Sequence, residues 1–119
     1  MLTFDNRFVR ELPGDPESRN FTRPVVGACW SPVAPTPVAD PQLLVYSREM
    51  AGVLGLGEAD ITSPALVAAL AGNDKLPGMA HYATCYGGHQ FGQWAGQLGD
   101  GRAIYLGEAM APSGQRWEM

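Results

Sequence analysis

The stretch that decides the fold runs from Tyr86 to Arg102 and reads YGGHQFGQWAGQLGDGR. Six of these residues are glycines, and glycine at this density lets the backbone adopt conformations, or approach a ligand to distances, that a side chain would forbid. An Asp-Gly step between two apolar runs favours the positive φ angles of a tight turn. The pattern predicts a glycine-rich β-hairpin with strands over 90–98 and 102–108 and its turn at 99–101.

The order of three glycines, Gly96-x-x-Gly99-x-Gly101, bears on the ligand. It is the reverse of the dinucleotide-binding fingerprint, and it lies in a predicted hairpin instead of a strand-to-helix turn. The chain contains no Gly-Lys-Ser/Thr string, which excludes a P-loop. Such a hairpin is similar to the loop that covers nucleotide phosphates in protein kinases, with Arg102 placed to meet negative charge. Spacing alone favours the alternative, a tight turn with a solvated Arg102.

The first 40 residues predict an extended, proline-rich arm. Seven of the ten prolines fall within or directly after it, and each proline biases the preceding residue away from helix. The arm also carries large apolar side chains that a free linker would not bear: Phe4, Phe8, Val25, Val26 and Trp30. We therefore expect the arm, residues 1–40, to pack against the remaining part of the chain, residues 41–119.

Two short helices are predicted after the arm. Asp40 followed by Pro41 is a typical N-cap with proline at the first helical position, and apolar residues then recur at helical spacing over 41–54. Ser63, again followed by proline, repeats this signal ahead of a helix over 64–71, which a glycine ends.

A further strand is predicted at the end of the chain. A turn signal, Pro-Ser-Gly at 112–114, precedes an alternating segment over 116–119. Because a strand needs a partner and sufficient length, we expect the chain to be part of a longer protein. Helices and hairpins in one small unit predict an α+β fold.

Composition limits the classes of function. A chain of 119 residues, 45% of them hydrophobic, forms one domain at most. Its net charge of -4 offers no basic surface for nucleic acid. The longest uncharged stretch, 80–99, carries histidines, glutamines and glycines that a bilayer core does not accept, so no membrane span is expected. The N-terminus lacks an apolar signal segment, which predicts a cytoplasmic protein with Cys29 and Cys85 as reduced thiols.

The glycine-rich string is part of a wider resemblance. Together with Leu-Gly-Glu at 106–108, Asp-Asn-Arg-Phe at 5–8, Glu-Leu-Pro at 11–13 and Pro-Thr-Pro at 35–37, the string 86–102 closely resembles the selenoprotein O family, also called SelO or YdiU. The resemblance covers nearly the whole chain. It implies a bacterial cytoplasmic protein with a protein-kinase-like fold, of which this chain is the N-terminal part: the extended arm, two helices and the glycine-rich hairpin of the small lobe.

The resemblance also implies an activity and a site. Members of the family are similar to protein adenylyltransferases, which bind ATP inverted relative to kinases and transfer AMP to Ser, Thr or Tyr hydroxyls of proteins. The family's ATP contacts on the Gly-Asp-Gly-Arg turn fall on Gly99, Gly101 and Arg102. Backbone approach explains the glycines and charge-assisted hydrogen bonding the arginine. Asp100 serves the turn, because a carboxylate beside polyphosphate is repulsive.

Other parts of the family's site are not expected in this chain. The family's next strand carries a lysine, and later segments supply a catalytic aspartate and the ligands of Mg²⁺ or Mn²⁺. Lys75 is the only lysine and stands far too early in the sequence, and Ala103 replaces a frequent glycine. We therefore expect the chain by itself to be inactive, with its catalytic and metal residues elsewhere in the polypeptide.

Two other functions stay open beside adenylyl transfer. A noncatalytic ATP-binding pseudokinase or interaction module would bind ATP without modifying a protein, and an ordinary kinase would transfer the γ-phosphoryl group. A metal site at His81, Cys85 and His89 is disfavoured, because glycines interrupt their spacing and a fourth ligand is not evident. His89 is expected to form a hydrogen bond at the hairpin base, and apolar surface is expected to be exposed around Trp94 and Leu106.

Overall fold

The computed structural model describes residues 1–19, 21, 23–100 and 103–119, and over 98–100 it describes the backbone alone. The fold is α+β, as the sequence predicts. The described elements, in chain order, are β1 (Thr3–Phe4), α1 (Arg7–Glu11), β2 (Trp30–Pro32), α2 (Arg48–Val53), α3 (Glu58–Ile61), α4 (Pro64–Leu70), β3 (Tyr82–Gln90), β4 (Gln93–Asp100), β5 (Glu108–Met110) and β6 (Arg116–Glu118).

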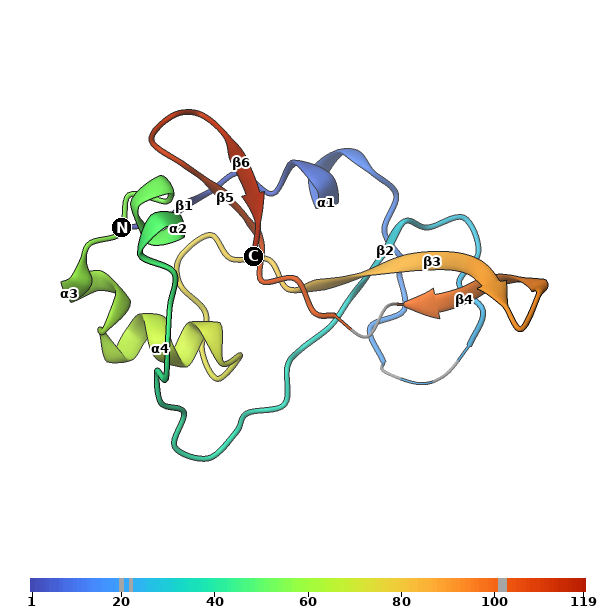
Figure 1. Cartoon of the computed structure of the whole chain (residues 1–119). Coiled ribbons are helices and arrows are strands. Elements are labelled where there is room, and N and C mark those ends of the chain that lie inside the picture. Colours follow the sequence, from blue (N-terminus) through green and yellow to red (C-terminus); the bar gives the residue numbers. More distant parts are fainter. Residues whose placement is uncertain (20, 22, 101–102) are drawn as a thin grey trace.

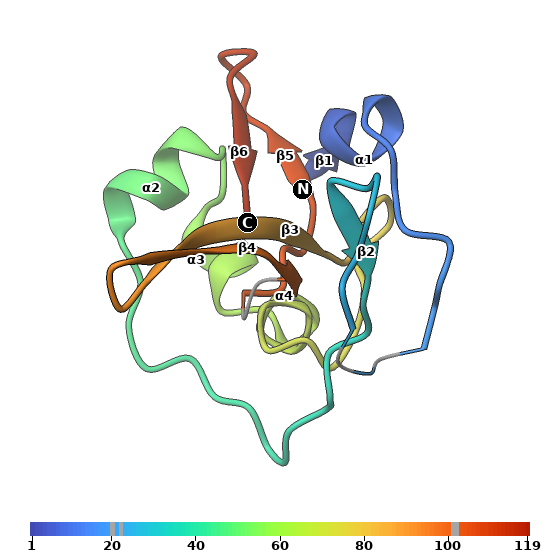
Figure 2. The ribbon, with the colours of Figure 1, turned by 90° about the vertical axis from the view of Figure 1, so that its right-hand side faces the viewer.

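The strands form two small antiparallel sheets. One has the order β1-β5-β6 and the other the order β2-β3-β4. Helices α2, α3 and α4 gather near the first sheet, and the β3–β4 hairpin extends to the opposite end of the molecule (Figure 1). After a turn of the view by 90°, β3 and β4 lie side by side, with β2 beside them (Figure 2). The hairpin is thus attached to the body through β2 and through the beginning of β3.

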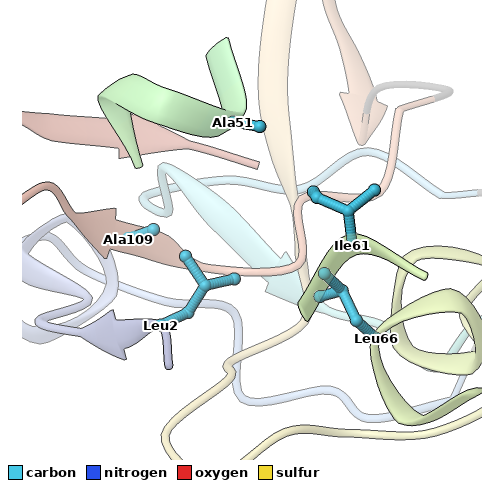
Figure 3. Packing of buried hydrophobic residues seen from close by; sticks show 5 residues of the cluster. All are labelled: Leu2, Ala51, Ile61, Leu66 and Ala109. Carbon is cyan, nitrogen blue, oxygen red and sulfur yellow. The ribbon is translucent and has the colours of Figure 1, made fainter. Parts of the chain in front are cut away.

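A small apolar core joins the first sheet to the helices. The buried side chains of this core come from β5, from α2–α4 and from the N-terminal residues (Figure 3), and they are Leu2, Ala51, Ile61, Leu66 and Ala109. The N-terminus reaches them because β1 pairs with β5, placing Thr3 opposite Met110. Burial of these groups stabilises the fold by removing apolar surface from water.

The N-terminal arm packs against the rest of the chain, as expected from its apolar residues. Its residues form β1, α1 and β2, of which the short helix α1 is not predicted from the sequence. The Phe8 ring of α1 stacks on Tyr82, with 5.4 Å between the ring centroids. Trp30 of β2 pairs with Thr84 of β3. The prolines keep much of the arm extended, and its aromatic residues fix it to β3.

The first helix predicted after the arm is shorter than its sequence pattern indicates. Instead of 41–54, α2 spans Arg48–Val53, and its N-cap is Ser47, whose side chain accepts a hydrogen bond from the Met50 N–H at 3.1 Å. Asp40 has a φ of +46° and caps no helix. The prediction was wrong because the apolar residues after Pro41 do not share one buried face, and Leu44 is almost fully exposed. Helical periodicity without burial does not sustain a helix.

The glycine-rich hairpin is present, but its turn lies earlier than predicted. β3 and β4 meet at Phe91 and Gly92, both with positive φ, as a two-residue type I′ hairpin turn requires. The predicted turn residues 99 and 100 instead belong to the end of β4, and no strand covers the described residues 103–107. The prediction placed the turn too late because Gly-Asp-Gly is the stronger local turn signal. In the structure, β3 pairs with β2 and then with β4, and these pairings place the turn at Phe91 and Gly92.

The other local predictions are confirmed. α4 spans Pro64–Leu70, with the Ser63 hydroxyl accepting a hydrogen bond from the Leu66 N–H at 3.3 Å. The turn before the last strand is present, with Gly114 at a φ of +85°, and β6 pairs with β5.

The single-turn helix α3 was not predicted. Its N-cap is Gly57, which has no side chain, so the cap contact is the one in which the Asp60 carboxylate accepts from the Gly57 N–H at 3.0 Å.

Candidate functional site

Strand β3 is the centre of the candidate site, because it is paired on both sides. Towards β2, the Cys85 N–H donates to the Cys29 carbonyl oxygen at 2.8 Å. Towards β4, Cys85 lies opposite Asp100. The end of β4 that carries Gly99 is therefore held by a strand that is itself held by the N-terminal arm.

The segment that follows β4 returns to the same strand. Tyr105 forms an antiparallel backbone bridge with Tyr82. The Tyr82 N–H donates to the Tyr105 carbonyl oxygen at 3.1 Å, and the Tyr105 N–H donates to the Tyr82 carbonyl oxygen at 2.8 Å. Asp100 on one side and Tyr105 on the other are thus both anchored to β3.

Of the three predicted ATP contacts, one lies in the described backbone. Gly99 is in β4, near the end of the strand. Gly101 and Arg102 lie outside the described residues. Their role in binding ATP therefore stays a prediction, and the structure contributes the position of the two ends between which they stand.

An aromatic stack is centred on Tyr82, the residue of β3 that pairs with Tyr105. Tyr82 is completely buried, and its ring stacks between Phe8, at 5.4 Å, and Tyr105, at 5.1 Å, measured between ring centroids. Trp30 approaches the same ring edge-on at 6.4 Å. Such contacts rigidify a small fold beyond the area that they bury. No local sequence signal marks this stack, because its members come from widely separated parts of the chain.

The Tyr82 hydroxyl has its own polar partner. It donates a hydrogen bond of 2.9 Å to Oε1 of Glu118 in β6. Burial, and after it the neighbouring Glu118 carboxylate, raises the pKa of Tyr82 above its ordinary value. The hydroxyl therefore stays protonated at neutral pH and acts as a donor that fixes β3 to β6.

An apolar groove lies beside the hairpin. It has a volume of about 590 Å³ and is lined by Phe8 and Leu12 of the arm, by the backbone neighbours Cys29 and Cys85, and by Trp94 of β4, among others. The Trp94 side chain is 62% exposed, which confirms the expected exposed apolar surface at this residue. The other residue expected there, Leu106, is half-buried instead.

The Trp94 ring packs closely against Gly87. A Cβ atom built on Gly87 would lie 2.8 Å from the Gly96 carbonyl oxygen and 3.1 Å from the Trp94 ring. The pairing of β3 with β4 is irregular on both sides of Gly87. His89 packs its ring edge against Trp94 with the centroids 5.1 Å apart, and the hydrogen bond predicted for His89 stays a prediction.

A polar network fixes the N-terminal residues on which the site rests. The Asn6 amide oxygen accepts from the Glu108 N–H at 3.1 Å, and its amide nitrogen donates to the Gly78 oxygen at 2.6 Å. The buried Glu108 carboxylate accepts from the Phe8 N–H at 2.5 Å. These bonds set the position of α1, and through it the position of the Phe8 ring against Tyr82.

Charged side chains nearby form ion pairs on the surface. Asp5 binds both Arg10, at 2.9 Å, and Arg116, at 2.5 Å, and hydrogen bonds from these guanidinium groups lower the pKa of Asp5. Hydrogen bonding from Arg19 lowers the pKa of Glu17 to about 2. Asp5 and Glu17 are thus carboxylates at neutral pH, with arginine partners.

Within the described ranges, no group of three or more His, Cys, Asp or Glu side chains could hold a metal ion. Of the three residues considered, His81 is buried in the body of the fold and His89 packs on Trp94. Nor is any helix in the described part of the chain long and apolar enough to cross a membrane.

Comparison with known proteins adds evidence independent of this geometry. Residues 23–119 match the model of a family described as protein adenylyltransferase SelO. The chain is 67% identical over 119 residues to the protein nucleotidyltransferase YdiU of Methylobacillus flagellatus, which it covers to 23% while 100% of this chain is aligned. It is 60% identical over 118 residues to the protein of the same name from Azoarcus sp., with 99% and 23% covered. The chain spans about a quarter of the length of these curated relatives.

Proposed function

The chain belongs to the SelO family of protein adenylyltransferases, and on this basis we propose that the polypeptide carrying it binds ATP and transfers AMP to Ser, Thr or Tyr hydroxyls of other proteins. The observation that carries the proposal is the family match over 23–119, which includes the complete glycine-rich hairpin and the segment anchored to β3. The relatives named above are nucleotidyltransferases.

The proposed ATP contacts are Gly99, Gly101 and Arg102. Glycines let backbone N–H groups approach phosphate oxygens closely, and a guanidinium group gives two charge-assisted hydrogen bonds to them. The described ends of this segment support the role, because Asp100 is paired with Cys85 and Tyr105 with Tyr82.

The remainder of the site is proposed to lie in the rest of the longer polypeptide. The relatives are about four times as long as this chain, and the kinase-like fold proposed for the whole protein needs a second lobe to complete the nucleotide site. The reaction is proposed to require Mg²⁺ or Mn²⁺. The described residues do not fit that metal, since no cluster of three ligating side chains occurs among them, so we derive no step through a metal from this chain.

The test uses the full-length polypeptide with Mg²⁺ and ATP labelled at either the α- or the γ-phosphate, together with a mixture of candidate acceptor proteins. Attachment of the α-label alone is the expected result. Arg102→Ala should reduce it by at least about tenfold, the loss of one charge-assisted contact to phosphate. Arg48→Ala, an exposed arginine of α2, is the matched control and should leave the reaction unchanged.

Two results would contradict the proposal. Attachment of the γ-label would identify a kinase. Binding of ATP without attachment of either label would identify the noncatalytic module instead.

A further inference from the structure

A second hollow lies in the body of the fold, away from the hairpin. It is bordered by the arm at Pro35 and Pro37, by the turn that follows α4, residues 72–75, and by His81 just before β3, and its volume is about 380 Å³. A water molecule takes about 30 Å³ of liquid, so the hollow exceeds the size of a single ion and can hold a small organic molecule.

The walls of this hollow are held in place. Asn73 bonds Val38 in both directions: the Val38 N–H donates to its amide oxygen at 2.8 Å, and its amide nitrogen donates to the Val38 oxygen at 2.7 Å. Gly72 has a φ of +78°, and a Cβ there would lie 2.5 Å from Cβ of Pro35. The turn after α4 and the connection between β2 and α2 are therefore in close, specific contact, and the hollow between them is a fixed feature of the fold.

His81 is the unexplained group at this hollow. It is only 7% exposed, and neither ring nitrogen has a hydrogen-bond partner among the described residues. Buried polar atoms are nearly always paired, because an unpaired one has lost its hydrogen bonds to water without replacement. Neither nitrogen is open to solvent in this ring orientation, but a half-turn about the Cβ–Cγ bond exchanges each nitrogen with a ring carbon.

The charges at the hollow favour one class of ligand. Lys75, the only lysine of the chain, and His81 line the same hollow, and after burial the Lys75 ammonium is the second cause that lowers the pKa of His81. Asp74 is the one carboxylate among the lining residues, and its Oδ1 already accepts the Lys75 N–H at 2.7 Å. The Lys75 ammonium therefore offers a cation in the lining of the hollow that the buried imidazole also lines, and the Asp74 carboxylate reduces the attraction of the hollow for an anion.

We propose that this hollow binds a small organic acid, whose carboxylate or phosphate group is held by the Lys75 ammonium and the His81 imidazole and whose apolar part lies against Pro35 and Pro37. An oxyanion would accept hydrogen bonds from the Lys75 ammonium and from one N–H of the His81 imidazole, which gives that His81 nitrogen the partner that it lacks. The proline rings present apolar surface without competing polar groups. None of the lining residues is a proposed ATP contact, and the site goes beyond the proposed function.

The test is a titration of the full-length polypeptide, labelled with ¹⁵N at histidine, followed through its imidazole NMR signals, with those of His81 and His89 assigned by their loss in His81→Gln and His89→Gln. The chain has two histidines, so His89, which packs on Trp94 in the hairpin, is an internal reference. Propionate, acetate and inorganic phosphate are the three probes. The expected result is a saturable shift of the His81 signals with millimolar affinity, while the His89 signals move little. Propionate binding more tightly than acetate supports the apolar wall, and phosphate binding more tightly than propionate assigns the site to phosphate esters.

Variants of exposed residues decide the outcome without disturbing the core. Lys75→Gln should weaken the response about fivefold by removing the cation, and Asp74→Asn should strengthen it about threefold by removing the opposing charge. Arg102→Ala should leave the His81 response unchanged, which separates this site from the ATP contacts. Equal shifts of both histidines, or a His81 response that ignores Lys75→Gln, would overturn the proposal.

Discussion

The hydroxyl of Tyr82 in β3 donates a 2.9 Å hydrogen bond to Oε1 of Glu118 in β6, and this bond joins the two sheets that the described strands form. Tyr82 is completely buried and stacks on Phe8 and Tyr105. One side chain thus connects the N-terminal helix α1, both sheets and the return point of the glycine-rich segment. Its position explains how a chain with a small aliphatic core holds the hairpin in a defined place.

Tyr82→Phe tests this connection. The variant keeps the aromatic stack and removes the hydroxyl, leaving Glu118 to solvent, so we expect a loss of about 1 kcal/mol in the free energy of unfolding. Urea denaturation followed by tryptophan fluorescence measures it. Tyr86→Phe, at an exposed position of the same strand, is the control and should change stability little. Equal stability of Tyr82→Phe and the parent chain would show that the bond contributes nothing.

Gly87→Ala tests the close packing inside the hairpin. The added methyl group meets the Gly96 carbonyl oxygen at 2.8 Å and the Trp94 ring at 3.1 Å, so the strands must separate, at a cost of about 1–3 kcal/mol. Gly88→Ala is the matched control, because nothing lies within 4 Å of a Cβ at that position. Amide exchange across β3 and β4 should accelerate in the first variant and not in the second. A well-protected hairpin in Gly87→Ala contradicts the packing described.

Phe91→Asn should stabilise the protein. Phe91 is fully exposed and has a φ of +51°, a conformation that is unfavourable for a bulky residue and favoured by Asn in type I′ turns. The gain expected is about 0.5–1 kcal/mol. Gly92→Ala, at a φ of +79°, should change stability in the opposite direction. Thermal unfolding of both variants measures the pair, and a destabilised Phe91→Asn would show that the ring makes a stabilising contact.

The stability of the fold should fall as the pH drops below about 6.5. Burial, and after it the nearby Lys75 ammonium, lowers the pKa of His81. Above the unfolded-state pKa, His81 is neutral in both states and adds no pH dependence to the free energy of unfolding. Below it, the unfolded chain binds a proton that the folded chain resists, so unfolding is favoured.

Urea titrations between pH 7.5 and 5 measure this effect. His81→Gln should flatten the pH dependence in that range, and His89→Gln should not. Carboxylates with lowered pKa values, such as Asp5 and Glu17, lose their contributions only at lower pH, so the two effects are separable. A decline that persists unchanged in His81→Gln would assign it to another group.

Local signals in the sequence were reliable where neighbouring residues alone decide the structure. Ser63 and Pro64 set the start of α4, and the turn before β6 follows from its Pro-Ser-Gly string. The continuous string 86–102 also indicated the family. The proposed role of Gly99, Gly101 and Arg102 follows from that family. These features depend on caps, turns and short motifs, whose partners lie within a few positions along the chain.

Only the tertiary structure decided the features that depend on distant partners. Pairing of β3 with β2 on one side and β4 on the other placed the hairpin turn at Phe91 instead of Gly99. The helix predicted over 41–54 is present only from Arg48, because the apolar residues before it, such as the exposed Leu44, do not share a buried face. The stacking of Phe8 and Tyr105 on Tyr82, and the hollow at His81, arise from residues far apart in sequence. Such contacts carry no local signal, because the free energy that selects them comes from burial and hydrogen bonds that exist only once the chain has folded.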